Sequence, residues 1–106
     1  MAYTKSLEFS PSEIELSEVA KALAHPARVC IIGILLEANT ATCGQIVKRL
    51  PLSQSTVSQH LKELKDARVV NADSRGSSVI YSLNNERWNR SRFIFNELFK
   101  KNPIIN

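Results

Sequence analysis

The chain is 106 residues long, 43% of it is hydrophobic, and its net charge is +4. This length and composition support one domain with a real core and exclude two ordinary domains. Two cysteines are too few for a secreted disulfide scaffold, and the longest apolar run, residues 29–36, is too short to span a bilayer. Because no export signal begins the chain either, we expect a soluble cytoplasmic protein.

The first predicted helix begins at a clear start signal. Ser10 is a suitable N-cap, Pro11 suits the first helical position, and Glu13 completes a capping box. We expect the chain to divide into a flexible arm (1–9), a single domain (10–101) and a flexible tail (102–106).

A proline marks the start of the second predicted helix. Pro26 disfavours helical geometry at His25 and begins a helix that runs to about Ala38. This helix is apolar on nearly all sides, which predicts a central core helix. Asn39 is a suitable left-handed terminator.

Two short helices follow, with a two-residue turn between them. Thr42 and Gln45 form a capping box at the start of the third helix, which Pro51 ends. Ser53 caps the fourth helix, residues 54 to about 67.

A hairpin and a last helix complete the predicted elements. They are two strands (69–72 and 79–83), the loop between them (73–78, with a turn glycine), and a helix from residue 86 to about 101 capped by Asn84 or Asn85. This order predicts a mainly α (α+β) winged helix-turn-helix, with a two-stranded β-hairpin wing and a C-terminal dimerisation helix.

The fourth helix has the pattern of a DNA-reading helix. At about 100° per residue, one face carries the apolar side chains that must pack inward, Val57, Leu61 and Leu64. The opposite face offers hydroxyls and amides, which pair with base edges, while Lys62 suits a phosphate. The predicted DNA-contacting residues of this helix are Gln54, Ser55, Thr56, Ser58, Gln59 and Lys62.

An ordinary solvated helix is the alternative interpretation of this face. Solvated faces usually mix lysine and glutamate, whereas residues 54–59 carry no charge. Residues 1–40 hold three basic and five acidic side chains (net −2), and residues 41–106 hold eleven and five (net +6). A basic half suits a polyanionic partner, so we favour DNA binding.

Arg75 lies at the predicted tip of the hairpin. An arginine on a protruding loop reaches phosphate or a narrow minor groove, so we include it among the DNA contacts. An exposed turn arginine without function fits the sequence equally well.

Three stretches carry a family pattern. They are residues 22–28 (ALAHPAR), residues 52–65 (LSQSTVSQHLKELK), and the Arg75-Gly76 wing followed by Tyr81-Ser82-Leu83. They resemble the ArsR/SmtB family of repressors, over about residues 13–99. The resemblance implies a dimeric winged helix whose first and last helices form the dimer interface. It also implies a protein that represses from an operator until an inducer weakens binding.

The aromatic stripe of the last helix supports a dimer independently. It offers more apolar surface than a lone terminal helix should leave in water, although it could instead pack on its own domain. The predicted dimerisation residues are Ile14, Trp88, Phe95, Leu98 and Phe99. A two-fold dimer would hold its recognition helices roughly 34 Å apart and require a near-palindromic operator.

The chain departs from the family pattern after the recognition helix. Arg68 stands where the family usually has glycine. A left-handed residue other than glycine costs ~1 kcal/mol, so we expect the helix to end differently.

A second departure concerns the inducer. The family's Cys-x-Cys metal ligands would fall at Thr42-Cys43-Gly44, with Cys43 between the two ligand positions, and the last helix has neither histidine nor cysteine. Tight metal sites need several converging ligands, so we predict no family-type metal site, no metal inducer and no cofactor.

The cysteines leave two interpretations open. Cys43 lies in a first helical turn, where the dipole favours thiolate, while Cys30 should be inert if the second helix is buried. A thiol switch is one interpretation, and two incidental residues is the one we favour. His60, at the edge of the inward face, suggests packing or a phosphate contact.

No catalytic signature is present. The glycines at 33, 44 and 76 build no cofactor loop, and there is no nucleophile elbow, so we predict no enzyme. The favoured function is a homodimeric, sequence-specific DNA-binding transcriptional repressor with an unidentified inducer. The alternative is a winged-helix protein-interaction module without specific DNA binding.

Overall fold

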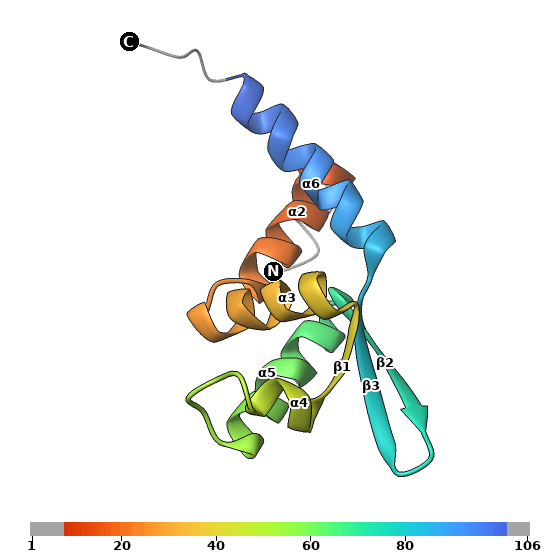
Figure 1. The fold of residues 1–106 in the computed structure, drawn as a ribbon. Helices are drawn as coiled ribbons and strands as arrows, with labels where there is room; N and C mark the ends of the chain where they lie inside the picture. The colour runs from red at the N-terminus through yellow and green to blue at the C-terminus, as the bar shows by residue number, and fades with distance from the viewer. Residues whose placement is uncertain (1–7, 102–106) are drawn as a thin grey trace.

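Residues 8–101 are described by a computed structural model (Figure 1). The predicted arm and tail lie almost wholly outside these residues. The elements follow in the order α2 (Pro11–Ala22), α3 (Pro26–Ala38), β1 (Thr40–Thr42), α4 (Cys43–Val47), α5 (Gln54–Asp66), β2 (Val70–Arg75), β3 (Ser78–Leu83) and α6 (Asn85–Lys100). We call residues 26–83 the head.

Side-chain caps fix the starts of the helices where the sequence predicts them. Ser10 Oγ accepts from the Glu13 amide over 3.1 Å, and Glu13 Oε1 accepts from the Ser10 amide over 3.0 Å. Thr42 and Gln45 make the same reciprocal pair at α4. Asn84, one of the two predicted candidates, caps α6.

The end of α5 differs from the expectation. Arg68 adopts a φ of 59°, the left-handed conformation that a residue other than glycine was expected to avoid. Two hydrogen bonds hold it there, from the Arg68 amide to Lys65 O (2.8 Å) and from the Val69 amide to Leu64 O (2.9 Å). These bonds form a Schellman motif, so the helix ends as it would with glycine. Asn39, with a φ of 70°, ends α3 as predicted.

The sheet has three antiparallel strands in the order β1-β3-β2. β2 pairs with β3 from Val70 opposite Leu83 to Arg75 opposite Ser78, which shortens the predicted six-residue loop to a turn at Gly76 (φ 62°). β1 pairs with β3 at Ala41 opposite Tyr81. The sequence did not predict β1, because three residues show no alternation.

The core lies between α3, α5 and the sheet. Its largest fully buried side chains are Val19, Ile31, Leu35, Ile46, Val57, Leu61, Leu64, Val69 and Val70. The prediction that α3 is buried on nearly all sides is wrong. Val29 and Leu36 are more than half exposed, and Cys30 is exposed, because α3 contacts α5 and the sheet on one side only.

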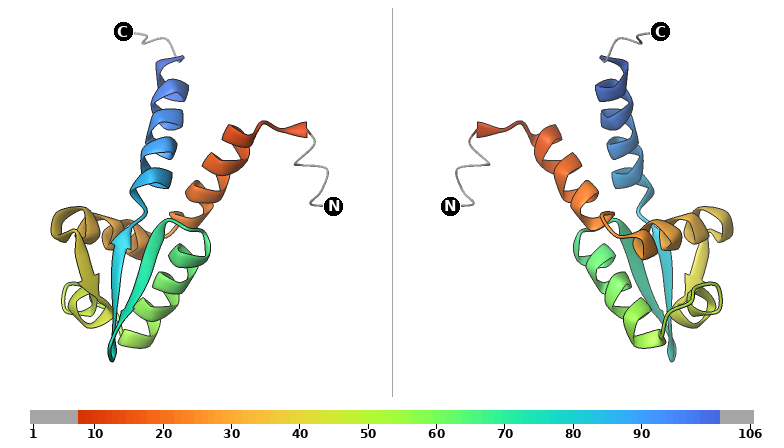
Figure 2. Two further views of the ribbon diagram at one scale, coloured as in Figure 1. Left: turned by 90° about the vertical axis from the view of Figure 1, so that its right-hand side faces the viewer. Right: turned by 90° about the vertical axis from the view of Figure 1, so that its left-hand side faces the viewer.

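The helices α2 and α6 extend from the head on the side away from the hairpin tip, and they diverge from each other (Figure 2). Among the described residues no single helix is long and apolar enough to cross a membrane. α2 and α3 reach that length and composition only together, across a 101° bend.

Candidate nucleic-acid interface

The helix α5 has the two faces that its sequence predicts. Val57, Leu61 and Leu64 are fully buried and hold the helix against the core. The six residues predicted to contact DNA from this helix are all exposed. Because the inward face is fixed, the polar face is held in one orientation toward solvent.

Hydroxyl groups cluster at the N-terminus of α5. Ser53 Oγ accepts from the Thr56 amide over 3.3 Å, lies 3.2 Å from Ser55 Oγ, and donates to Thr56 Oγ1 over 3.0 Å. The N-terminus of a helix favours negative charge. This end therefore combines exposed hydroxyls with a positive dipole end, which suits a phosphate.

Two of the predicted contact residues bind acidic side chains one turn further along α5. Gln59 Nε2 donates to Glu63 Oε2 over 3.2 Å, and Lys62 Nζ lies 2.9 Å from Asp66 Oδ2. The hydrogen bond to Asp66 raises the pKa of Lys62. A nucleic acid that binds Gln59 or Lys62 must therefore replace these exposed contacts with contacts to its own bases or phosphates.

The hairpin tip lies at the same end of the molecule as the N-terminus of α5 (Figure 2). Arg75 is the last residue of β2, its side chain is 71% exposed, and its Nε lies 2.8 Å from Asp73 Oδ2. The predicted wing and the predicted reading face thus lie at one end of the head.

His60 lies behind this surface rather than on it. It is 8% exposed, its Nδ1 accepts from Arg28 Nε over 3.1 Å, and its ring lies 4.4 Å from that of His25. Burial lowers the pKa of His60, and the charges of His25 and Arg28 lower it further. His60 therefore joins α5 to the start of α3. Of the two roles predicted for it, packing and a phosphate contact, this is the packing role.

Comparison with known proteins gives this geometry a family. Residues 25–72 match the family described as bacterial regulatory protein, arsR family. The transcriptional repressor PagR of Bacillus anthracis is 37% identical over 71 residues, 67% of this chain and 71% of PagR. The chain belongs to the ArsR family.

Solved structures of relatives support this assignment. The PagR structure superposes with a TM-score of 0.67 at 33% identity, covering 80% of this chain and 94% of PagR. The structure of HlyU from Vibrio cholerae, which is named a transcriptional activator, gives 0.70 at 29% identity and covers 83% and 96% of the two chains. The winged helix-turn-helix prediction is confirmed, and this ArsR-family chain is a DNA-binding transcriptional regulator, not an enzyme.

The thiols of this ArsR-family chain lie in unexpected environments. Cys30 is exposed, so the burial that would have made it inert is not observed. Partial burial raises the pKa of Cys43, which opposes the predicted effect of the helix dipole. Within residues 8–101 no three His, Cys, Asp or Glu side chains are grouped so that they could hold a metal ion.

The predicted dimerisation residues divide into two groups. Ile14 and Phe95 are half-buried, and Trp88 packs on the core. Leu98 and Phe99 are 54% and 68% exposed. A groove of about 320 Å³ between α2 and α6 is lined mainly by apolar atoms and ends at Phe99.

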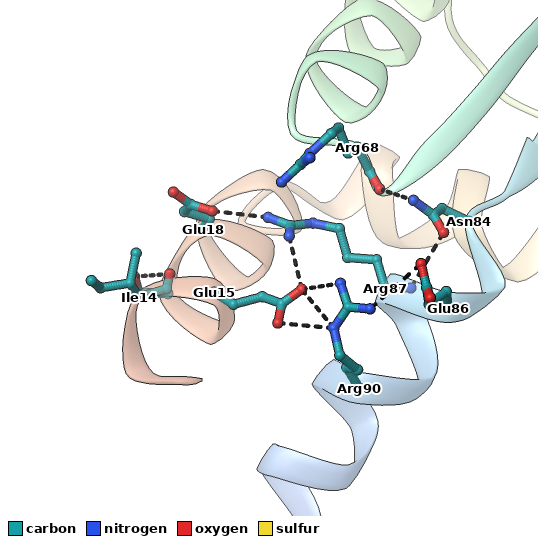
Figure 3. Close-up of polar contacts among 9 residues, drawn as sticks. Ile14, Glu15, Glu18, Arg68, Asn84, Glu86, Arg87 and Arg90 are labelled. Atoms are coloured by element: carbon teal, nitrogen blue, oxygen red, sulfur yellow. Dashed lines mark hydrogen bonds and ion pairs between the residues drawn. The ribbon is translucent and has the colours of Figure 1, made fainter. Parts of the chain in front are cut away.

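An ion-pair cluster that the sequence analysis missed joins α2 to α6 (Figure 3). Arg87, 3% exposed, donates to Glu15 Oε2 and Glu18 Oε1 over 2.9 Å each. Arg90 also binds Glu15, and its hydrogen bonds lower the pKa of that carboxyl. The sequence does carry a signal for this cluster: Glu15 and Glu18 lie three positions apart, as do Arg87 and Arg90. This spacing places each pair on one face of its helix and indicates that the two helices face each other.

This cluster changes the interpretation of the charge asymmetry. Part of the positive charge after residue 40 neutralises carboxylates before it, since Arg87 and Arg90 bind Glu15 and Glu18. The surplus available to a polyanion is therefore smaller than the net charge of +6 on residues 41–106 suggests.

Proposed function

We propose that this ArsR-family chain is a homodimeric, cytoplasmic transcriptional repressor that reads operator DNA with α5 and the wing. The observation that carries the proposal is the exposed, charge-poor face at the capped start of α5, beside the hairpin. PagR of Bacillus anthracis and SdpR of Bacillus subtilis, 35% identical over 69 residues, are both named transcriptional repressors.

The proposed DNA contacts divide by chemistry. The amides and hydroxyls of α5 suit base edges and phosphates, and Lys62 and Arg75 suit the backbone. The proposed contact residues are Gln54, Ser55, Thr56, Ser58, Gln59, Lys62 and Arg75.

We propose the α2–α6 side as the dimer interface. Leu98 and Phe99 are each more than half exposed there, and Phe99 also lines the apolar groove. Contiguous exposed apolar surface of this kind marks interaction sites. The proposed interface residues are Ile14, Trp88, Phe95, Leu98 and Phe99.

The test is selection of bound duplexes from a random pool, followed by binding titrations over a salt series. We expect a near-palindromic site with half-sites roughly 34 Å apart and an affinity that falls log-linearly with salt. Recovery of no preferred sequence would contradict the proposal and favour a protein-interaction module. A promoter–reporter assay distinguishes repression from activation.

The inducer is proposed only by class. His25 and His60 lie side by side, but within residues 8–101 no third His, Cys, Asp or Glu completes a metal-binding group, which supports an inducer that is not a metal. Equilibrium dialysis that finds one tightly bound zinc, cadmium or arsenite per protomer would overturn this part of the proposal.

A further inference from the structure

A second cleft, of about 730 Å³, lies where α2, the C-terminal end of α5 and the start of α6 meet. It lies at the C-terminal end of α5, beyond Lys62, the last residue of the predicted reading face. Seven of its lining residues are charged, and four of the seven are basic. The proposed function uses none of them.

Three of the basic residues have no acidic partner. Within residues 8–101, Lys21, Arg28 and Arg68 make no ion pair with a carboxylate. Arg28 donates only to neutral acceptors, His60 Nδ1 over 3.1 Å and Ala22 O over 3.2 Å. Their charges are therefore available to an anion in the cleft.

The three carboxylates of the cleft are already engaged in the protein without DNA. Glu18 accepts from Arg87, Glu63 accepts from Gln59, and Asp66 pairs with Lys62. Two of these bonds neutralise the carboxylate with a full positive charge. The repulsion that an incoming anion meets is correspondingly reduced.

Arg87 lines the cleft from α6 and has an unsatisfied donor. It is 3% exposed, and its two terminal nitrogens bind Glu15 and Glu18, but its Nε has no partner. A buried unpaired donor of this kind is unusual. Arg68 lies in the same region (Figure 3).

We propose that this cleft binds a compact dianion, a phosphate monoester or a small dicarboxylate, held by Arg28, Arg68 and Lys21. Arginine binds phosphate and carboxylate groups alike through paired hydrogen bonds, so one site suits either ligand. The site connects the end of α5 to α2 and α6. The regulatory step rests on the proposed function: the bound anion changes how α5 is held against α2 and α6, and it therefore alters operator affinity.

Arg68→Gly is the decisive variant because it separates binding from folding. Arg68 has a φ of 59°, which glycine adopts without strain, so the variant should fold and melt at a higher temperature than the parent. It also removes one of the three anion-binding charges. Lys48→Gln is the matched control, since it removes an exposed positive charge that does not line the cleft.

Isothermal titration of the full chain at constant ionic strength tests binding. Inorganic phosphate, glucose 6-phosphate and succinate are titrated separately, so the phosphate and dicarboxylate sources are distinguished. We expect saturable binding of one anion per protomer, weakened roughly ten-fold or more in Arg68→Gly and unchanged in Lys48→Gln. Absence of saturable binding, or equal binding by Arg68→Gly, would overturn the proposal.

Operator retardation with and without the tightest-binding anion tests the regulatory consequence. The anion should shift operator affinity for the parent and leave Arg68→Gly unshifted. A parent that binds the anion but shows no shift contradicts the regulatory part. A protein that binds the anion but no operator leaves the site intact and contradicts the proposed function, so the two failures are distinguishable.

Discussion

The head and the α2–α6 pair are held together by different interactions. All of the largest fully buried side chains except Val19 belong to the head. The α2–α6 pair adds the ion pairs of Arg87 with two glutamates to the packing of Val19 and Trp88 on the core, and it leaves Leu98 and Phe99 in water. The head thus completes its core within one chain, while α2 and α6 keep an unburied apolar surface. This difference matches the proposed division between reading DNA and assembling a dimer.

The largest effect should follow from a cavity in the head. Leu61→Ala removes a fully buried side chain, and such changes cost about 2–5 kcal/mol of the free energy of unfolding. Urea denaturation measures the loss. The control is Leu98→Ala, whose side chain is 54% exposed. It should weaken self-association in sedimentation and scarcely change the midpoint at a protein concentration low enough that the monomer predominates. Equal losses for the two variants would remove the distinction between the regions.

A smaller loss should follow from opening the α2–α6 cluster. Arg87→Met leaves Glu18 without its partner and should cost about 1–3 kcal/mol of unfolding free energy. Arg90→Met, at an exposed position, should cost less because Arg87 still binds Glu15. A double-mutant cycle with Glu15→Gln measures the coupling. No coupling between Arg87 and Glu15 would mean that apolar contacts alone hold the pair.

A contact within the head, between α5 and the start of α3, should respond to pH. Burial lowers the pKa of His60 below its usual 6.5, so the unfolded chain binds a proton more readily than the folded one. Stability is then complete above about pH 6.5 and falls as pH decreases, by at most about 1.4 kcal/mol per pH unit for one proton. Denaturation at a series of pH values checks this. In His60→Gln the slope near pH 6 should disappear, and a slope that persists would assign it to another group.

A second loss should appear in acid. Hydrogen bonds from Arg90 lower the pKa of Glu15 below 4.5, so its contribution is complete above that pH and is lost as pH falls through the lowered value. The same pH series in Glu15→Gln should lack this second decline. If the parent and Glu15→Gln decline alike, the cluster does not contribute.

The smallest effect on stability should come from the reading face. Lys62→Gln removes an exposed pair with Asp66, and the unfolding midpoint should stay within experimental error. Its operator affinity should fall, and the slope of log affinity against log salt should decrease by about 1. An unchanged salt slope would show that Lys62 does not contact a phosphate.

The sequence predicted the elements whose ends are determined locally. Capping residues such as Ser10, Thr42 and Ser53 bind amides within three positions, so short-range chemistry places the helix starts. The two faces of α5 were also predictable, because its apolar spacing is regular. Both inferences depend on neighbours in the chain.

Two features could not be predicted because they depend on distant partners, and a third because local hydrogen bonds oppose the preference of the residue. β1 exists because β3 lies beside it, and Arg87 is buried because Glu15, 72 positions away, faces it. Arg68 adopts a left-handed conformation because the Schellman hydrogen bonds outweigh the local preference against it. In the first two cases a tertiary contact overrides the local pattern, whereas at Arg68 two backbone hydrogen bonds within five positions override the preference of the residue itself.

The most direct test of the account is operator binding by α5 measured with paired variants. Fluorescence anisotropy on a selected palindromic duplex should show two protomers per duplex for the parent. Gln59→Ala, on the exposed face, should lose about 1–3 kcal/mol of discrimination between the selected sequence and a mismatch. Lys48→Gln should keep that discrimination. An unchanged preference in Gln59→Ala, Ser55→Ala and Ser58→Ala would contradict the claim that this face reads DNA.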